Sequence, residues 1–122
     1  MSIAREFAKR IVAMRVDDMP AEALAWSKVG LLDTVGVTLA GAREDATRIV
    51  EEVLASPSDG ASLVFGGNRR VGPLDAALIN GTAAHALDYD DCSDTLGGHP
   101  SAPVLPALFA LDRKSTRLNS SH

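Results

Sequence analysis

The sequence predicts a mainly α-helical domain. Over most of the chain, apolar residues recur at the three- and four-residue spacing of helices, and prolines and glycines stand near the places where those helices begin or end. Aromatic residues make up only 4% of the chain, so the core is expected to consist of Ala, Leu, Val and Ile. A length of 122 residues with 46% hydrophobic content allows one domain with its own core.

The first predicted helix covers residues 3–14 and is amphipathic. Ser2 precedes it, and a serine at this position can accept hydrogen bonds from the free N–H groups of the first turn. The apolar residues of this helix follow one another at spacings of four, four and three: Ile3, Phe7, Ile11 and Met14.

The second predicted helix covers residues 21–40. Pro20 suits its first turn, because a proline there removes an N–H group that would have no partner in the helix. Gly41 is a natural C-cap. Residues 31–40 are apolar on most faces of the helix, so we expect this half to be buried.

Three further elements lead to the fifth helix. A helix over 45–55 is expected to face the core through its apolar residues, Ile49, Val50, Val53 and Leu54. Turn residues occupy 56–60, and residues 61–65 form a short extended segment. A helix rich in small residues runs from Pro73 to Leu87, a loop covers 88–101, and a last helix begins over 103–111.

The last eleven residues, 112–122, differ sharply from the apolar segment before them. They read DRKSTRLNSSH, and one back-translation of this string matches a widely used sequencing adapter. We therefore expect residues 1–111 to be a partial helical domain and residues 112–122 to be an assembly artefact.

Composition excludes several classes of protein. The net charge of −4 argues against nucleic-acid binding, which needs a basic face. A single cysteine, Cys92, excludes an intrachain disulfide and fits a reducing compartment. The N-terminal residues lack the apolar region of a signal peptide, and we expect no membrane-spanning segment. The sequence therefore predicts a cytoplasmic protein.

Chemically reactive side chains gather between residues 85 and 99. This stretch contains two imidazoles, four carboxylates, the single thiol and the single tyrosine: His85, Asp88, Tyr89, Asp90, Asp91, Cys92, Asp94 and His99. Carboxylates this close repel one another unless donors or cations compensate them. The stretch is a candidate site at the edge of the core, although aspartates at the end of a helix are often only solvated turn formers.

Two metal-binding interpretations apply to the same stretch. Asp90, Asp91 and Asp94 fit the DDxxD pattern of all-α enzymes that hold Mg²⁺ against a diphosphate, but Gly97, Gly98 and Pro100 end any helix there. His85, Cys92, His99 and an aspartate are suitable zinc ligands without a recognised spacing. We therefore predict no metal ligand, and keep the diphosphate enzyme as an alternative function.

Several blocks of sequence resemble the MmgE/PrpD family. They are the run Asn80–Asp91, the triplet His99–Ser101, the segment Val104–Ala107 and, earlier in the chain, Leu31–Gly41. The resemblance covers essentially residues 3–111. The family includes 2-methylcitrate dehydratase, cis-aconitate decarboxylase and an iminodisuccinate epimerase. Its members have a large helical domain and a smaller lid domain, commonly form homodimers, and need no iron–sulfur cluster, so we expect no cofactor.

The resemblance also implies roles for individual residues. Asp88 matches the first aspartate of the family's Asp-aromatic-Asp-Asp block and His99 matches the histidine of its His-Pro pair, so both are expected to be catalytic. Cys92 stands where the family often has threonine; together with Asp91 and His85 it is expected to bind substrate.

The expected substrate is a small di- or tricarboxylic acid, converted by dehydration or decarboxylation. Such chemistry needs an acid/base and cations that hold the carboxylates. In the family, lysines and another histidine from later in the chain supply this charge, so this N-terminal piece is expected to be inactive alone. A non-catalytic helical dimerisation module is the remaining alternative.

Overall fold

The computed structural model describes residues 2–54 and 60–119, and its elements confirm a mainly helical fold. Two short strands form an antiparallel pair, with Ser62 opposite Val71 and Leu63 opposite Arg70. In chain order the elements are α1 (Ile3–Ala13), the 3-10 turn η1 (Val16–Asp18), α2 (Ala21–Gly41), α3 (Asp45–Val53), β1 (Ser62–Leu63), β2 (Arg70–Val71), α4 (Pro73–His85) and α5 (Ser101–Asn119). The predicted helices are confirmed to within a few residues at their ends.

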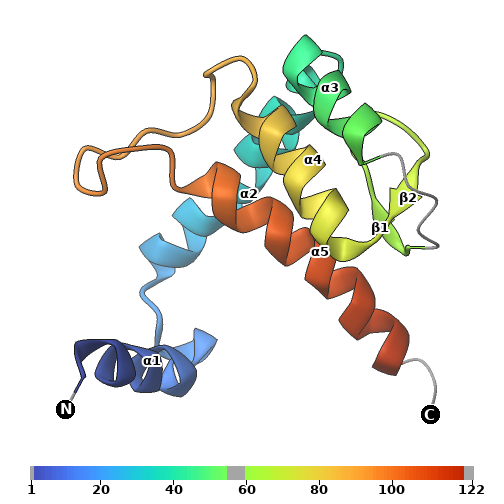
Figure 1. The fold of residues 1–122 in the computed structure, drawn as a ribbon. Coiled ribbons are helices and arrows are strands. Elements are labelled where there is room, and N and C mark those ends of the chain that lie inside the picture. The colour runs from blue at the N-terminus through green and yellow to red at the C-terminus, as the bar shows by residue number, and fades with distance from the viewer. Residues whose placement is uncertain (1, 55–59, 120–122) are drawn as a thin grey trace.

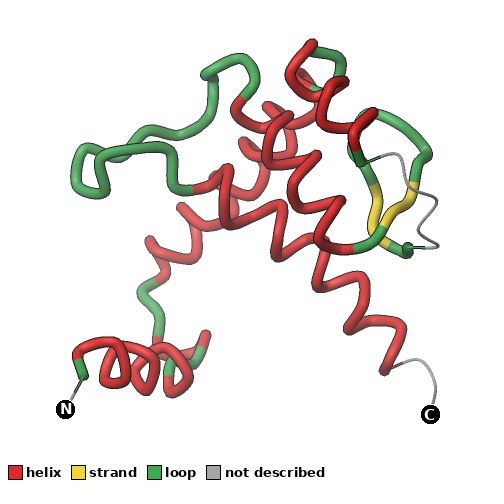
Figure 2. Tube along the Cα trace, viewed as in Figure 1, coloured by secondary structure: helices red, strands yellow, loops and turns green. Residues whose placement is uncertain are grey.

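Helix α4 lies at the centre of the domain (Figures 1 and 2). It packs against α2, α3, α5 and both strands. Its buried residues are mostly small: Ala76, Ile79, Asn80, Ala83 and Ala84. Small side chains let neighbouring helices approach closely, so the position of α4, and of the residues at its end, is fixed from several sides.

Close approach between α2 and α4 depends on Gly41. We expected this glycine to cap α2 from outside, but it is the last residue of the helix, and Ala42 occupies the cap position. A Cβ atom at position 41 would collide with the backbone carbonyl of Ala83 in α4. Gly41 is therefore required by packing and not by a special backbone conformation.

Asn80 joins the strand pair to α4. Its side-chain oxygen accepts a hydrogen bond from the backbone N–H of Phe65 at 2.9 Å, and its amide nitrogen donates to the carbonyl of Leu63 at 2.9 Å. Ser62 adds a link to α5, because its hydroxyl donates to the carbonyl of Ala110 at 3.0 Å. The extended segment predicted over residues 61–65 is thus present as β1, whereas β2 was not predicted.

Several apolar faces that were expected to be buried are exposed. In α2, Leu32 is 76% exposed, and the buried residues of the second half are Thr34, Thr38 and Gly41. In α3, Ile49 and Val53 are exposed, while Val50 and Leu54 pack against the core. Helices α2 and α3 each pack against the domain along one face. Apolar residues on their opposite faces are therefore exposed to solvent.

Helix α1 lies apart from the other helices in Figure 1. None of its residues is buried, and its apolar stripe faces solvent. The expected cap is wrong in one respect, because the Ser2 side chain makes no capping hydrogen bond, although its carbonyl accepts from the N–H groups of Arg5 and Glu6.

By length and composition alone, α2 is apolar enough to cross a membrane, which the sequence analysis did not expect. Its contacts are those of a helix in a packed domain. It meets α4 and α5, and its buried positions include Thr34 and Thr38, the latter donating to the carbonyl of Thr34 at 2.6 Å. Thr34 and Thr38 thus lie on the face of α2 that packs within the domain, and most of the rest of the helix is not buried.

Helix α5 begins at Ser101, two residues earlier than predicted, and continues to Asn119. It therefore passes through Leu111, where we placed the boundary between the domain and the tail. That residues 112–122 are an artefact stays a prediction.

Two glycines of α2 provide a matched test of this packing. We expect Gly41→Ala to lower the free energy of unfolding by about 2 kcal/mol, because the added methyl group meets the Ala83 carbonyl. An added methyl group at Gly36 would have nothing within 4 Å, so Gly36→Ala should raise the free energy of unfolding by up to about 1 kcal/mol. Urea denaturation of both variants measures the difference. Equal stabilisation by both substitutions would contradict the close contact.

Candidate functional site

The loop over residues 86–100 brings together two histidines from its opposite ends. His85 is the last residue of α4, and His99 stands two residues before α5 begins. A backbone bridge between Ser93 and Gly98 closes the outer part of the loop. The two imidazole rings meet edge to face, with their centroids 4.7 Å apart. Residues fourteen positions apart in the sequence therefore form one site.

Asp90 lies between the two imidazoles. Its side chain is only 1% exposed. One carboxylate oxygen, Oδ1, lies 2.9 Å from Nδ1 of His85 and 3.3 Å from Nδ1 of His99. The other oxygen lies 3.2 Å from Nδ1 of His85, and the backbone carbonyl of Asp90 lies 3.3 Å from Nδ1 of His99. The buried carboxylate is thus compensated by both rings.

Asp88 occupies a strained backbone position beside His99. Its φ of 55° is in the left-handed region, which aspartate enters more readily than most residues. This turn, closed by a hydrogen bond from its N–H to the His85 carbonyl at 3.1 Å, sets the exposed carboxylate 3.4 Å from Nε2 of His99. Residues held in such conformations often belong to functional sites.

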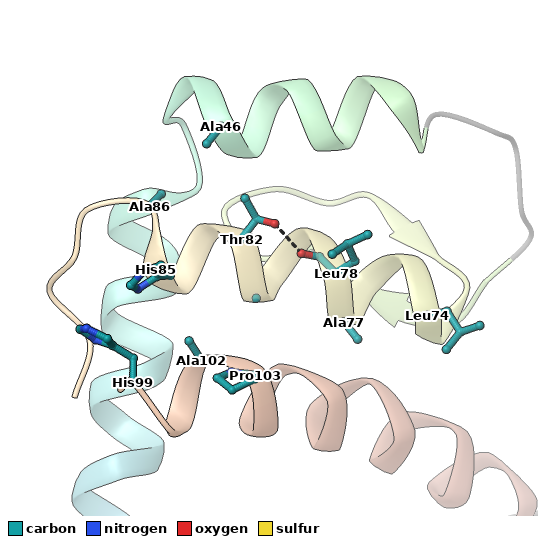
Figure 3. Close-up of a pocket in the computed structure, with 11 residues that line it drawn as sticks. Ala46, Leu74, Ala77, Leu78, Thr82, His85, Ala86, His99, Ala102 and Pro103 are labelled. Atoms are coloured by element: carbon teal, nitrogen blue, oxygen red, sulfur yellow. Dashed lines mark hydrogen bonds between the residues drawn. The ribbon is translucent and has the colours of Figure 1, made fainter. Parts of the chain in front are cut away.

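Both imidazoles line an open pocket of about 860 Å³ (Figure 3). Figure 3 shows the two rings near each other at one end of the pocket, with Thr82 and Leu78 of α4 along its wall. Most of the lining is apolar, and none of the described residues that line it is Lys or Arg. The pocket therefore offers groups that carry protons but no fixed positive charge.

Comparison with known proteins identifies the family. The MmgE/PrpD N-terminal domain matches residues 5–119, which is most of the chain. The chain belongs to the MmgE/PrpD family.

Curated relatives of this MmgE/PrpD chain are named as decarboxylases. It is 33% identical over 112 residues to the human cis-aconitate decarboxylase, covering 90% of this chain. It is 31% identical over 113 residues to the cis-aconitate decarboxylase-like protein oryM of Aspergillus oryzae, covering 89%. The Aspergillus terreus cis-aconitate decarboxylase is 31% identical over 98 residues, covering 80%. The chain spans 20–23% of the length of these relatives.

The structure brings together three of the five residues that were predicted for the site of this family member. His85 and His99 line the pocket with their rings in contact, and Asp88 lies 3.4 Å from Nε2 of His99. Cys92 is exposed and is not among the residues that line the pocket with the histidines. A role for Cys92 in substrate binding stays a prediction.

Asp91 faces a different part of the domain. Its carboxylate accepts hydrogen bonds from the N–H of Ser101 at 3.1 Å and from the Ser101 hydroxyl at 2.7 Å. Ser101 is the first residue of α5, so Asp91 compensates N–H groups at the start of that helix. It also lines a separate apolar groove with Trp26 and Leu105. This geometry supports a structural role more directly than the predicted contact with substrate.

The aspartates of the DDxxD pattern point to different partners. Asp90 binds the two imidazoles, Asp91 binds Ser101, and Asp94 is exposed outside any helix. A diphosphate enzyme needs these carboxylates on one side of one helix, so the structure disfavours that alternative.

Four of the described side chains have donor atoms close enough to hold a metal ion. One donor atom each from His85, Asp88, Asp90 and His99 lies within 4.8 Å of the others. Nitrogen and carboxylate donors of this kind suit a divalent transition-metal ion. The hydrogen bonds and ion pairs within the group already satisfy the buried carboxylate of Asp90 without an ion.

Asp90 belongs to this candidate site by its contacts but is not among the five site residues predicted from the sequence. It is one of four aspartates within seven positions, and the sequence gives no sign of which carboxylate turns inward. The available signal was the pair of histidines, His85 and His99, on either side of the acidic run. A carboxylate that contacts two imidazoles is better compensated than its neighbours, so it can be buried.

The contact with Asp90 raises the pKa of His85 above its usual value of 6.5. The hydrogen bond from the imidazole to the Asp90 carboxylate contributes most, followed by the attraction between their charges. The charge of Asp88 acts in the same direction, and burial opposes it. His85 therefore keeps its proton to a higher pH than an isolated histidine.

This raised pKa predicts a dependence of stability on pH. Protonated His85 stabilises the fold below pH 6.5, the value in the unfolded chain, and the contribution is lost as pH rises through the higher native pKa. The groups that face His85 are Asp90, Asp88 and His99. We expect the difference in free energy of unfolding between the unaltered chain and His85→Gln to shrink as pH rises above 6.5. Urea denaturation at several pH values around and above 6.5 measures this difference in free energy of unfolding. A difference that is independent of pH would contradict the interaction between His85 and Asp90.

Proposed function

We propose that this chain is the N-terminal part of a lyase that acts on citrate-like carboxylic acids, with cis-aconitate decarboxylation as the reaction. The observation that supports it most is the arrangement of His99, Asp88 and His85 beside a pocket, in a chain whose relatives are named cis-aconitate decarboxylases. Dehydration of 2-methylcitrate, known in the family, is the second candidate of the same class.

His99 is the proposed acid in this reaction. In decarboxylation the C–C bond to one carboxylate breaks, CO₂ leaves, and the electron pair left on the substrate carbon takes up a proton. Nε2 of His99 faces the Asp88 carboxylate at 3.4 Å, where a proton can be held before transfer. Asp88 then keeps the imidazole oriented and compensates its charge.

Substrate binding requires groups that the described pocket does not contain. A tricarboxylate carries several negative charges, and the carboxylates of Asp88 and Asp90 repel it. Stabilising a carbanion-like state also needs preorganised positive charge. We therefore propose that cations from the remaining length of the protein complete the site, and that this chain alone is inactive.

Other predictions from the sequence belong to this proposal as well. They are a homodimer in the full-length protein, a cytoplasmic location, and no nucleic acid, membrane or cofactor among its partners. The exposed apolar stripe of α1 is compatible with the alternative of a non-catalytic dimerisation module, in which His99 would have no effect on any reaction.

An assay of turnover tests the proposal. We expect the purified chain to leave both cis-aconitate and 2-methylcitrate unchanged, with products followed by liquid chromatography. A full-length protein that carries this chain should release CO₂ from cis-aconitate, and His99→Gln in it should lower kcat by about 10²-fold or more.

Asp94→Asn is the matched control, because Asp94 is exposed and lies outside the pocket. It should leave turnover unchanged in the full-length protein. Turnover by the chain alone would contradict the incomplete site. Turnover unaffected by His99→Gln would contradict the role of this histidine, and an equal loss of turnover in Asp94→Asn would contradict a specific role of His99.

A further inference from the structure

Asp90 is the one acidic or basic residue among the described side chains that are buried. An ionised carboxylate in such a position is costly unless strong donors compensate it. The described groups facing this carboxylate are the two imidazoles. Asp90 is costly to bury and contacts both histidines of the site. It is therefore suited to determine which ring nitrogen of each histidine carries the proton.

The chemistry of the partners assigns the ring protons. A carboxylate and a backbone carbonyl can only accept hydrogen bonds. Nδ1 of His85 faces the two carboxylate oxygens of Asp90 at 2.9 and 3.2 Å, and Nδ1 of His99 faces its carbonyl and Oδ1, both at 3.3 Å. Donation from Nδ1 of His85 to the carboxylate, and from Nδ1 of His99 to the carbonyl, requires that each ring carry a proton on Nδ1. The approach of Oδ1 to His99 is an ion-pair contact beside that hydrogen bond.

This assignment leaves Nε2 as the exchanging atom of both rings. Nε2 of His99 lies 3.4 Å from the exposed carboxylate of Asp88, an ion-pair contact that water can replace, whereas the hydrogen bond of this ring runs from Nδ1 to the Asp90 carbonyl. Nε2 of His85 has no hydrogen-bond partner in the described part of the chain. Both rings line the pocket. A neutral imidazole with its proton on Nδ1 has a lone pair on Nε2 that accepts a proton, and it returns that proton from the same atom.

We propose that Asp90 is the positioning residue of the site, holding His99 and His85 with Nδ1–H directed inward so that two Nε2 atoms serve the pocket. The use of the Nε2 atoms in catalysis rests on the proposed function. The tautomers are inferred from the hydrogen bonds alone. It gives His85 a role in proton transfer or in hydrogen bonding to the substrate, in addition to the acid role of His99.

Imidazole tautomers are measurable on the chain itself without substrate. Long-range ¹H–¹⁵N correlation spectra, recorded at a pH where both rings are neutral, distinguish a protonated from a bare ring nitrogen. We expect both His85 and His99 to show a protonated Nδ1 and a bare Nε2. Rings that carry the proton mainly on Nε2 would overturn the proposal, whether or not any variant folds.

A matched pair of substitutions tests the part played by the carboxylate. Asp90→Leu keeps a similar volume and removes both acceptor oxygens, so His85 should lose its preference for a protonated Nδ1. His99 should retain part of its preference through the backbone carbonyl. Asp94→Leu, at an exposed position in the same loop, should leave both rings unchanged. An unchanged His85 tautomer in a folded Asp90→Leu variant would overturn the proposal.

In the full-length protein, Asp90→Leu should lower kcat by roughly 10²–10⁴-fold with a smaller change in KM, as expected for a carboxylate that orients a catalytic imidazole. Asp94→Leu should change neither. Failure of this inference is distinguishable from failure of the proposed function. Mixed tautomers in an active decarboxylase would refute the inference alone, and the predicted tautomers in a protein without decarboxylase activity would refute the function alone.

Discussion

A buried carboxylate shared by two imidazoles is the constraint on which this site depends. The loop over residues 86–100 contains no helix, and its glycines give it little conformational restriction of its own. Asp90 holds both ends of that loop, because His85 belongs to the end of α4 and His99 to the approach to α5. Without these contacts, the Asp90 carboxylate would be buried without compensation, and no shared partner would hold the two imidazoles together.

The packing of α4 places one end of this arrangement. Small residues on α4 allow α2, α3 and α5 to approach it, and Gly41 lets α2 pass directly over the Ala83 carbonyl, two residues before His85. The N-terminus of α5 places the other end. Asp91 binds the first residue of α5 and thereby anchors the loop close to where His99 leads into Pro100 and Ser101. Neighbouring aspartates thus have different tasks, one toward the imidazoles and one toward a helix terminus.

Most of the fold was predictable from the sequence, whereas the burial of individual faces was not. Periodicity and the positions of Pro20, Pro73 and the glycines depend on local chemistry, so the helices were placed well. Burial depends on what covers each helix, and Leu32 or Ile49 is exposed because no described element reaches it. In the site, the resemblance to family blocks singled out His85, Asp88 and His99, and the fold brings these three side chains together; their roles stay predictions. The inward turn of Asp90 arises from a loop conformation with a left-handed Asp88, which local propensity does not determine.

The proposed reaction needs positive charges that the described pocket lacks. The described residues that line the pocket include two imidazoles and no Lys or Arg, whereas the proposed citrate-like substrate needs cations to hold its carboxylates. The chain spans 20–23% of the length of its curated relatives. The exposed apolar faces of α1 and α2 are further surfaces without a partner among the described elements.

The central claim is that the loop brings His85 and His99 into contact around Asp90. A nuclear Overhauser experiment on the chain, with the histidine rings assigned, tests it most directly. Rings whose centroids lie 4.7 Å apart should give cross-peaks between their ring protons. Assigned, well-resolved rings with no such cross-peak would contradict the account.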